Sequence, residues 1–143
     1  MKIQSLTEDS NAKSLIRRIQ AVLEPSLLRP QYRKQVEANP EHHCTFGHCY
    51  AASEALWHLL GGMGSDWRPV VGQHPEYGPH WWLVNSSGER LDPTAEQFEN
   101  LGTTPPYEHG VRKGFLTPKP SARAQKIILS VADTNPPHHH SRQ

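Results

Sequence analysis

The chain has 143 residues, which is the length of one ordinary domain. Its 15 basic and 14 acidic residues leave a net charge of +1, so charge gives no reason to expect a nucleic acid or an anionic membrane as a partner. Apolar residues make up 35% of the chain and there are 13 prolines, which predicts a small core and long loops. No apolar run approaches the ~20 residues of a membrane-spanning helix, and the N-terminal residues lack the apolar stretch of a signal peptide, so we expect a soluble, cytoplasmic protein.

Two helices are predicted in the first part of the chain. Apolar residues recur at helical spacing up to Leu23, with Ser10 or Asn11 as the expected cap and Pro25 as the expected stop. The segment 29–38 predicts a second, shorter helix that has a proline in its first turn, where a missing N–H costs nothing.

A third helix and three strands are predicted next. The helix covers residues 48–60 and is followed by two glycines, which are typical of a helix end. The first strand, 67–73, contains Pro69, which predicts an edge position or an irregular start. The second strand, 79–85, is rich in aromatic and β-branched residues, and the third, 89–92, pairs back onto it across a short turn.

The remainder of the chain is predicted to be mostly irregular from residue 93 to 120. A last helix follows over 121–131, with Ser121 as its cap. We expect a single domain over residues 1–132 and a disordered tail over 133–143. Helices that precede a small antiparallel meander predict the α+β class.

Cys49 stands at the beginning of the third helix, and its position has two interpretations. It extends the apolar stripe formed by Ala52, Leu56 and Leu59, so it could be a small core residue. A helix N-terminus also carries unpaired N–H groups and a partial positive charge, which stabilise a thiolate. The same N–H groups can bind a developing oxyanion, so Cys49 is a candidate nucleophile that requires a base.

The two strands after this helix supply a histidine and a carboxylate. His80 opens one strand and Asp92 closes the next. A three-residue turn, 86–88, with its glycine in the left-handed position, places Trp82 opposite Asp92 and puts His80 on the same face, diagonal to Asp92. A two-residue turn would shift the register by one and move Asp92 to the other face. The glycine favours the first register, in which Asp92 could orient the His80 ring.

The order of these residues resembles the papain-like superfamily, and especially its transglutaminase-like branch. The elements that carry the resemblance are "GHCYAASEAL", "HWWLV" and "LDPTAEQF". It implies a papain-like core in which a nucleophile helix packs on an antiparallel meander. Cys49 would be the nucleophile, His80 the general base and acid, and Asp92 the orienter. It also implies a cysteine hydrolase or acyltransferase that needs no cofactor and acts on an amide, isopeptide, ester or thioester. The whole chain is also similar to small phage and bacterial proteins, a likeness that implies no activity.

Four further residues are candidates around this site. Papain-like enzymes place a glutamine six residues before the nucleophile as a second oxyanion donor, and this chain has His43 there. Gln73 is another candidate donor, on a strand that is expected to neighbour His80. Trp81 and Trp82 point to opposite faces of their strand, so one is expected to pack on the core and the other to wall a substrate cleft.

Two alternatives to an enzyme remain open from the sequence. The first is a structural zinc site, since Cys44 and Cys49 have a spacing found in zinc sites. Its further ligands would come from His42, His43, His48 and His80. The second is a papain-like module without catalysis, which binds a partner through a tryptophan-lined groove.

Overall fold

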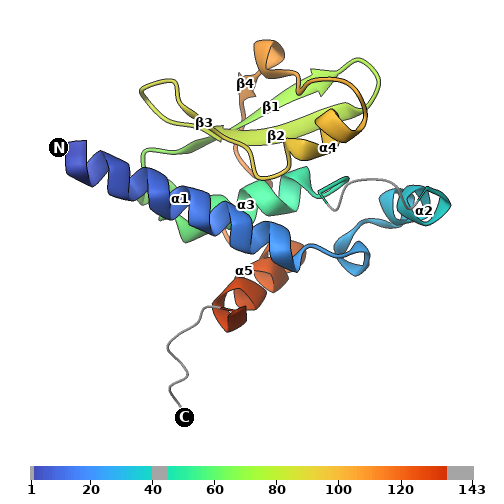
Figure 1. Ribbon diagram of the computed structural model, residues 1–143, viewed down its shortest axis with the longest axis horizontal. Helices are drawn as coiled ribbons and strands as arrows, with labels where there is room; N and C mark the ends of the chain where they lie inside the picture. Colours follow the sequence, from blue (N-terminus) through green and yellow to red (C-terminus); the bar gives the residue numbers. More distant parts are fainter. Residues whose placement is uncertain (1, 40–44, 135–143) are drawn as a thin grey trace.

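In the computed structural model, which describes residues 2–39 and 45–134, five α-helices and four strands follow one another along the chain (Figure 1). The helices are α1 (Lys2–Val22), α2 (Pro30–Ala38), α3 (Cys49–Leu59), α4 (Glu96–Asn100) and α5 (Ala122–Thr134). The strands are β1 (Arg68–His74), β2 (Gly78–Val84), β3 (Arg90–Leu91) and β4 (Val111–Arg112). The α+β class is therefore confirmed. None of the described helices is both long enough and apolar enough to cross a membrane.

The four strands form one antiparallel sheet in the order β3-β2-β1-β4. The turn between β2 and β3 has the predicted form, because Gly88 has a φ of 83° and the Asn85 N–H donates to the Glu89 carbonyl at 3.1 Å. Leu83 pairs with Leu91, and this register continued by one residue places Trp82 opposite Asp92. The three-residue turn and its register are thus confirmed.

Strand β4 lies in a segment that was expected to be irregular, and it shows that the edge position, one of the two alternatives predicted from Pro69, is wrong. β1 is an inner strand that pairs with β2 on one side and with β4 on the other. Pro69 is tolerated there because it lies where the β4 ladder ends. Its carbonyl still accepts the Lys113 N–H at 3.3 Å, and only the bond that its missing N–H would have donated is lost.

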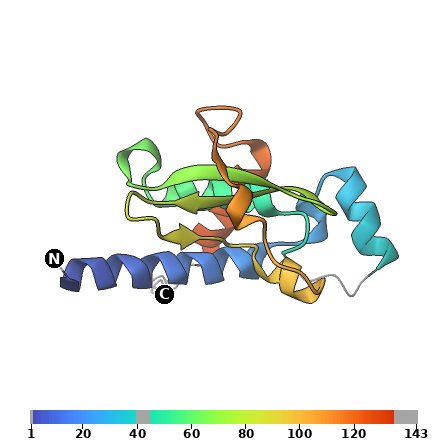
Figure 2. The same cartoon turned by 90° about the horizontal axis from the view of Figure 1, so that it is seen from above.

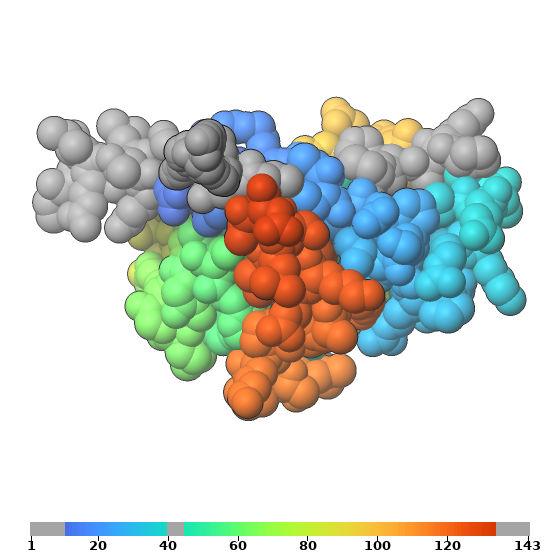
Figure 3. Space-filling model, turned by 90° about the horizontal axis from the view of Figure 1, so that it is seen from below, coloured from blue at the N-terminus to red at the C-terminus, as the bar shows by residue number. Residues whose placement is uncertain are grey.

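Helix α3 lies between the sheet and the two long helices α1 and α5, and the main core is formed there (Figure 1). Alanines on α3 let the neighbouring helices approach closely, and large aliphatic residues of α1, α5 and β2 fill the space between them. The fully buried members of this core include Ile19, Ala52, Ala55, Leu56, Leu83 and Ile127. Seen from the side opposite the sheet, α5 crosses the middle of the surface (Figure 3).

The ends of several elements differ from the sequence prediction. α1 begins at Lys2 and not near Ser10 or Asn11, and α4 forms inside the segment predicted to be irregular. α5 continues through Asp133, which was assigned to the tail, while residues 135–143 lie outside the described part.

The Ser121 cap is confirmed, since its hydroxyl accepts the Ala124 N–H at 3.3 Å. Helix α2 has the predicted bounds within one residue and lies at one end of the molecule (Figure 2).

Candidate active site

Cys49 is the first residue of α3, and two hydrogen bonds align this helix with β2. The Ser53 hydroxyl donates to the Trp81 carbonyl at 3.0 Å, and the Cys49 thiol donates to the Pro79 carbonyl at 3.7 Å. Four residues of helix and two residues of strand both advance by about 6 Å, so one helix face can contact alternate carbonyls of the strand. Because the two spacings agree, the half-buried thiol of Cys49 lies at the start of β2, where His80 is also found.

His80 is buried, with 1% of its surface exposed, and its two ring nitrogens have different surroundings. Nε2 lies 2.7 Å from Oδ2 of Asp92, and we assign the proton of this bond to the histidine. Nδ1 is buried and has no hydrogen-bond partner among the described residues. The ring also interacts with the Cys49 side chain, and because Nε2 faces Asp92, we assign this interaction to Nδ1.

The surroundings of His80 favour its charged form. Burial lowers the pKa of an imidazole, but the hydrogen bond to Asp92, the interaction with Cys49 and the charge of Asp92 outweigh burial. Together they raise the pKa of His80 from 6.5 to about 9. These surroundings favour an imidazolium that holds a proton between the Cys49 sulfur and the Asp92 carboxylate.

Asp92 is held by two further residues besides His80. Its Oδ1 accepts the Thr94 N–H at 3.0 Å, and its Oδ2 accepts the Tyr107 hydroxyl at 2.8 Å. Burial and the neighbouring Asp92 charge raise the pKa of Tyr107, so the phenol keeps its proton and remains a donor. The Arg90 guanidinium lies 3.8 Å from the centre of the Tyr107 ring, and this cation–π contact also holds the ring in position.

Tyr107 was not identified from the sequence, although it contacts the carboxylate directly. It lies on the short 3-10 helix Tyr107–His109, in the segment that was predicted to be irregular. A tyrosine 15 residues after an aspartate has no characteristic spacing, and only the fold brings the two together. The two prolines before it were the available signal, because they restrict the backbone at this point.

The two tryptophans pack on opposite faces of β2, as predicted, but neither lines the cavity that adjoins His80. Trp82 stacks on the His80 ring with centroids 5.7 Å apart and contacts Tyr107 edge to face. Trp81 packs against Tyr50 and Phe115 on the side of α3. Trp82 is 2% exposed, so it packs against one face of the imidazole and does not form a cleft wall open to solvent.

His48, which precedes the nucleophile candidate, is buried and makes no side-chain cap for α3. Burial, with a smaller contribution from the Arg123 charge, lowers the pKa of His48 to about 4. A neutral His48 places no second positive charge behind Cys49, so His80 is the protonated histidine of the site.

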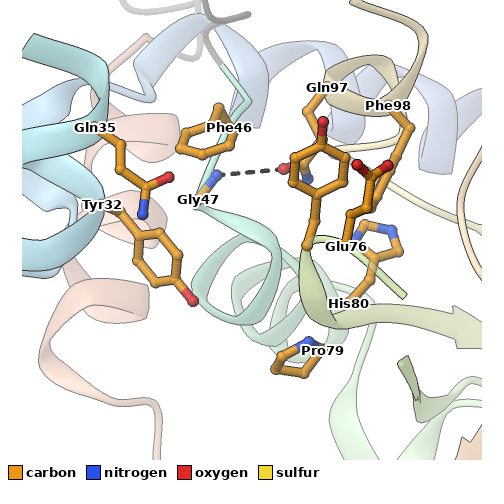
Figure 4. A pocket seen from close by; sticks show the side chains of 10 residues that line it. Tyr32, Gln35, Phe46, Gly47, Glu76, Pro79, His80, Gln97 and Phe98 are labelled. Carbon is orange, nitrogen blue, oxygen red and sulfur yellow. Dashed lines mark hydrogen bonds between the residues drawn. The ribbon is translucent and has the colours of Figure 1, made fainter. Parts of the chain in front are cut away.

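A cavity of about 140 Å³ adjoins His80 (Figure 4). One wall comes from α2 and the residues before α3, and the opposite wall comes from the β1–β2 turn, the start of β2 and α4. Gln97 joins the two walls, because its side-chain oxygen accepts the Gly47 N–H at 3.4 Å and its amide donates to the Thr94 carbonyl at 3.1 Å. Gly47 thereby connects the segment before the nucleophile to the segment that follows Asp92.

We expect Gly47→Ala to destabilise the protein by about 2 kcal/mol and to slow alkylation of Cys49. Gly47 has a φ of 81°, which costs other residues about 1–2 kcal/mol, and an added Cβ would lie 2.9 Å from Leu28 Cδ2. Gly102→Ala is the matched control, since Gly102 has a φ of 78° but open space around it. Urea unfolding and iodoacetamide labelling of both variants measure the difference; equal labelling rates would show that the Gly47 contact does not position Cys49.

The candidate oxyanion donor His43 lies outside the described part of the chain, as do His42 and Cys44 of the zinc alternative. Gln73 is exposed and lies opposite Pro79 across the β1–β2 ladder, on the strand next to His80 as predicted. Within residues 2–39 and 45–134, no group of three or more His, Cys, Asp or Glu side chains is placed to hold a metal ion.

Comparisons of the chain with protein-family models, with curated proteins and with solved structures found no match. The geometry of the site is therefore the basis for assigning a function.

Proposed function

We propose that the protein is a cysteine-dependent acyl-transfer enzyme, with a papain-like arrangement of Cys49, His80 and Asp92. The observation that supports this most directly is the His80 ring between two partners. Nε2 is fixed on Asp92 at 2.7 Å, and Nδ1 is buried and unpartnered in the described structure beside the thiol. His48 and His58 also leave one buried ring nitrogen without a partner among the described residues, so it is the pairing of the other His80 nitrogen with Asp92, together with the open one, that supports a role as a base.

In the proposed first step the Cys49 thiol gives its proton to Nδ1 of His80, and the sulfur attacks the carbonyl carbon of the substrate. A carbon–sulfur bond forms, and the carbonyl electron pair moves onto oxygen. The N–H groups in the first turn of a helix lack helical partners, and in this proposal those of α3 stabilise the oxyanion.

In the second step the imidazolium returns the proton to the leaving amine, alcohol or thiol, the bond to that group breaks, and a thioester remains on Cys49. Water or an amine, deprotonated by His80, then attacks the thioester and releases the acyl product. Asp92 holds Nε2 throughout, so Nδ1 keeps facing the reaction. The substrate class is an amide, isopeptide, ester or thioester.

The charge of His80 can be tested by alkylating Cys49 with two reagents. Below pH 9 the imidazolium attracts anionic iodoacetate, while neutral iodoacetamide is unaffected. We expect the ratio of the iodoacetate rate to the iodoacetamide rate to fall severalfold as the pH rises from 7 to 10. Peptide mapping assigns the label to Cys49 or Cys44. A ratio that does not change with pH, or faster labelling of Cys44, would contradict the proposal.

A further inference from the structure

The cavity beside His80 lies on the histidine side of the site and not on the thiol side. His80 and Pro79 contribute to its wall, whereas Cys49 does not (Figure 4). In the proposed mechanism the sulfur keeps the acyl group, and His80 gives a proton to the leaving group. A cavity that adjoins His80 is therefore placed for the leaving portion of the substrate and not for the acyl portion.

The wall of this cavity is rich in aromatic rings. They come from four separate places in the fold and are contributed by Tyr32, Phe46, Tyr77 and Phe98. Tyr32 and Phe46 contact each other edge to face on one side, and Phe98 contacts His80 edge to face on the other. Aromatic walls bind alkyl chains by contact and bind cations through the negative face of the ring.

The charges around the cavity favour a cation over an anion. Glu76 contributes a carboxylate to the wall, and no lysine or arginine is among the residues that line it. The one cationic group of the wall is His80, whose charge is compensated by Asp92 at 2.7 Å. The phenols of Tyr32 and Tyr77 and the amide of Gln35 add hydrogen-bonding groups for an ammonium ion.

The volume of about 140 Å³ limits the size of the group. It is close to the about 150 Å³ of a protein cavity that takes up one benzene molecule, a ligand of six heavy atoms. We propose that this cavity binds an alkylammonium side chain, of the length of a lysine side chain, on the leaving portion of the substrate. The placement on the leaving side rests on the proposed acyl transfer, whereas the binding of an alkylammonium does not. The ammonium stays protonated in the cavity, so it is a recognition group and not the reacting nitrogen.

Binding can be measured without catalysis in the Cys49→Ala variant by NMR titration at pH 7 and low salt. The probes are n-butylammonium, n-butanol and butyrate, which are alike in length but differ in charge. The reporters are the Gly47 amide and the side-chain amide of Gln97, which are hydrogen-bonded to each other at the cavity. We expect millimolar binding of n-butylammonium, at least fivefold weaker binding of n-butanol, and no shift with butyrate.

Two variants test the proposed contacts. Glu76→Gln should weaken n-butylammonium binding about threefold to tenfold and leave n-butanol unchanged, and Tyr77→Leu should also weaken binding of the cation selectively. Glu108→Gln is the control, because Glu108 is exposed and does not line this cavity. Equal affinities for the cation and the alcohol, or no shift at Gly47 and Gln97 with any probe, would overturn the proposal. If the cation bound selectively but Cys49 of the wild-type protein proved unreactive, the proposal for the cavity would stand and the acyl-transfer function would be rejected.

Discussion

Replacing His80 by glutamine should slow the alkylation of Cys49 by iodoacetamide about 10²-fold at pH 6.5. In the proposed mechanism His80 takes up the thiol proton and so supplies the reactive thiolate. An ordinary cysteine, with a pKa of about 8.5, is only about 1% thiolate at pH 6.5, and glutamine cannot take up the proton. The same change should reduce turnover of an activated ester by about 10²–10⁴-fold, the usual contribution of a general base.

The matched control for this experiment is His109→Gln, since His109 is exposed and lies outside the site. Cys49→Ser gives the background labelling from Cys44. A His80→Gln protein that unfolds like the wild type in urea but labels at the wild-type rate would show that the imidazole does not activate Cys49. An equal loss of rate in His109→Gln would show a nonspecific effect of histidine replacement.

The central geometry of the site followed from local sequence signals. The helix that begins at Cys49 was predicted from its apolar stripe and the glycines after it. The register that joins His80 to Asp92 followed from Gly88, because a glycine in the left-handed position selects the three-residue turn. Both signals are local, and the side-chain period of two along each strand then determines which residues share a face.

The remaining parts of the site depend on long-range packing and could not be predicted in this way. β4 has only two residues, both exposed, and forms because β1 offers an unpaired edge. Tyr107 reaches Asp92 because the segment between α4 and β4 crosses the sheet, and no periodic pattern marks such a crossing. The role of Gln97, which joins Gly47 to Thr94, likewise depends on the start of α3 and the start of α4 lying side by side.

Asp92→Asn should lower turnover of an activated ester by about 10–10³-fold. Asparagine keeps the shape of the side chain but loses the charge that stabilises the imidazolium, and its amide can donate to Nε2 and favour the wrong tautomer. In serine triads the corresponding change costs about 10⁴-fold. A cysteine depends less on its base, because a thiol ionises more readily than a hydroxyl, and the expected loss is therefore smaller.

The same substitution should change how stability depends on pH. The pKa of His80 is raised from 6.5 to about 9 in the folded protein, so the stabilisation is fully present below pH 6.5 and is lost as the pH rises through 9. At about 1.4 kcal/mol for each pH unit, this amounts to about 3 kcal/mol. In Asp92→Asn burial remains but the carboxylate charge is gone. The pKa of His80 should then fall, and stability should no longer decline between pH 6.5 and 9.

The Tyr107→Phe variant tests the effect of the orientation of Asp92 separately from the effect of its charge. It removes the 2.8 Å hydrogen bond to Oδ2 but leaves the carboxylate and its bond to His80 in place. We expect a stability loss of about 1 kcal/mol, a turnover loss of less than tenfold, and an unchanged decline of stability between pH 6.5 and 9. Urea unfolding at pH 6.5, 7.5 and 9 and ester turnover for the wild type and both variants provide the comparison. If Asp92→Asn kept the wild-type decline, the Asp92 carboxylate would not be what holds the proton on His80, and Asp92 would have only a structural role.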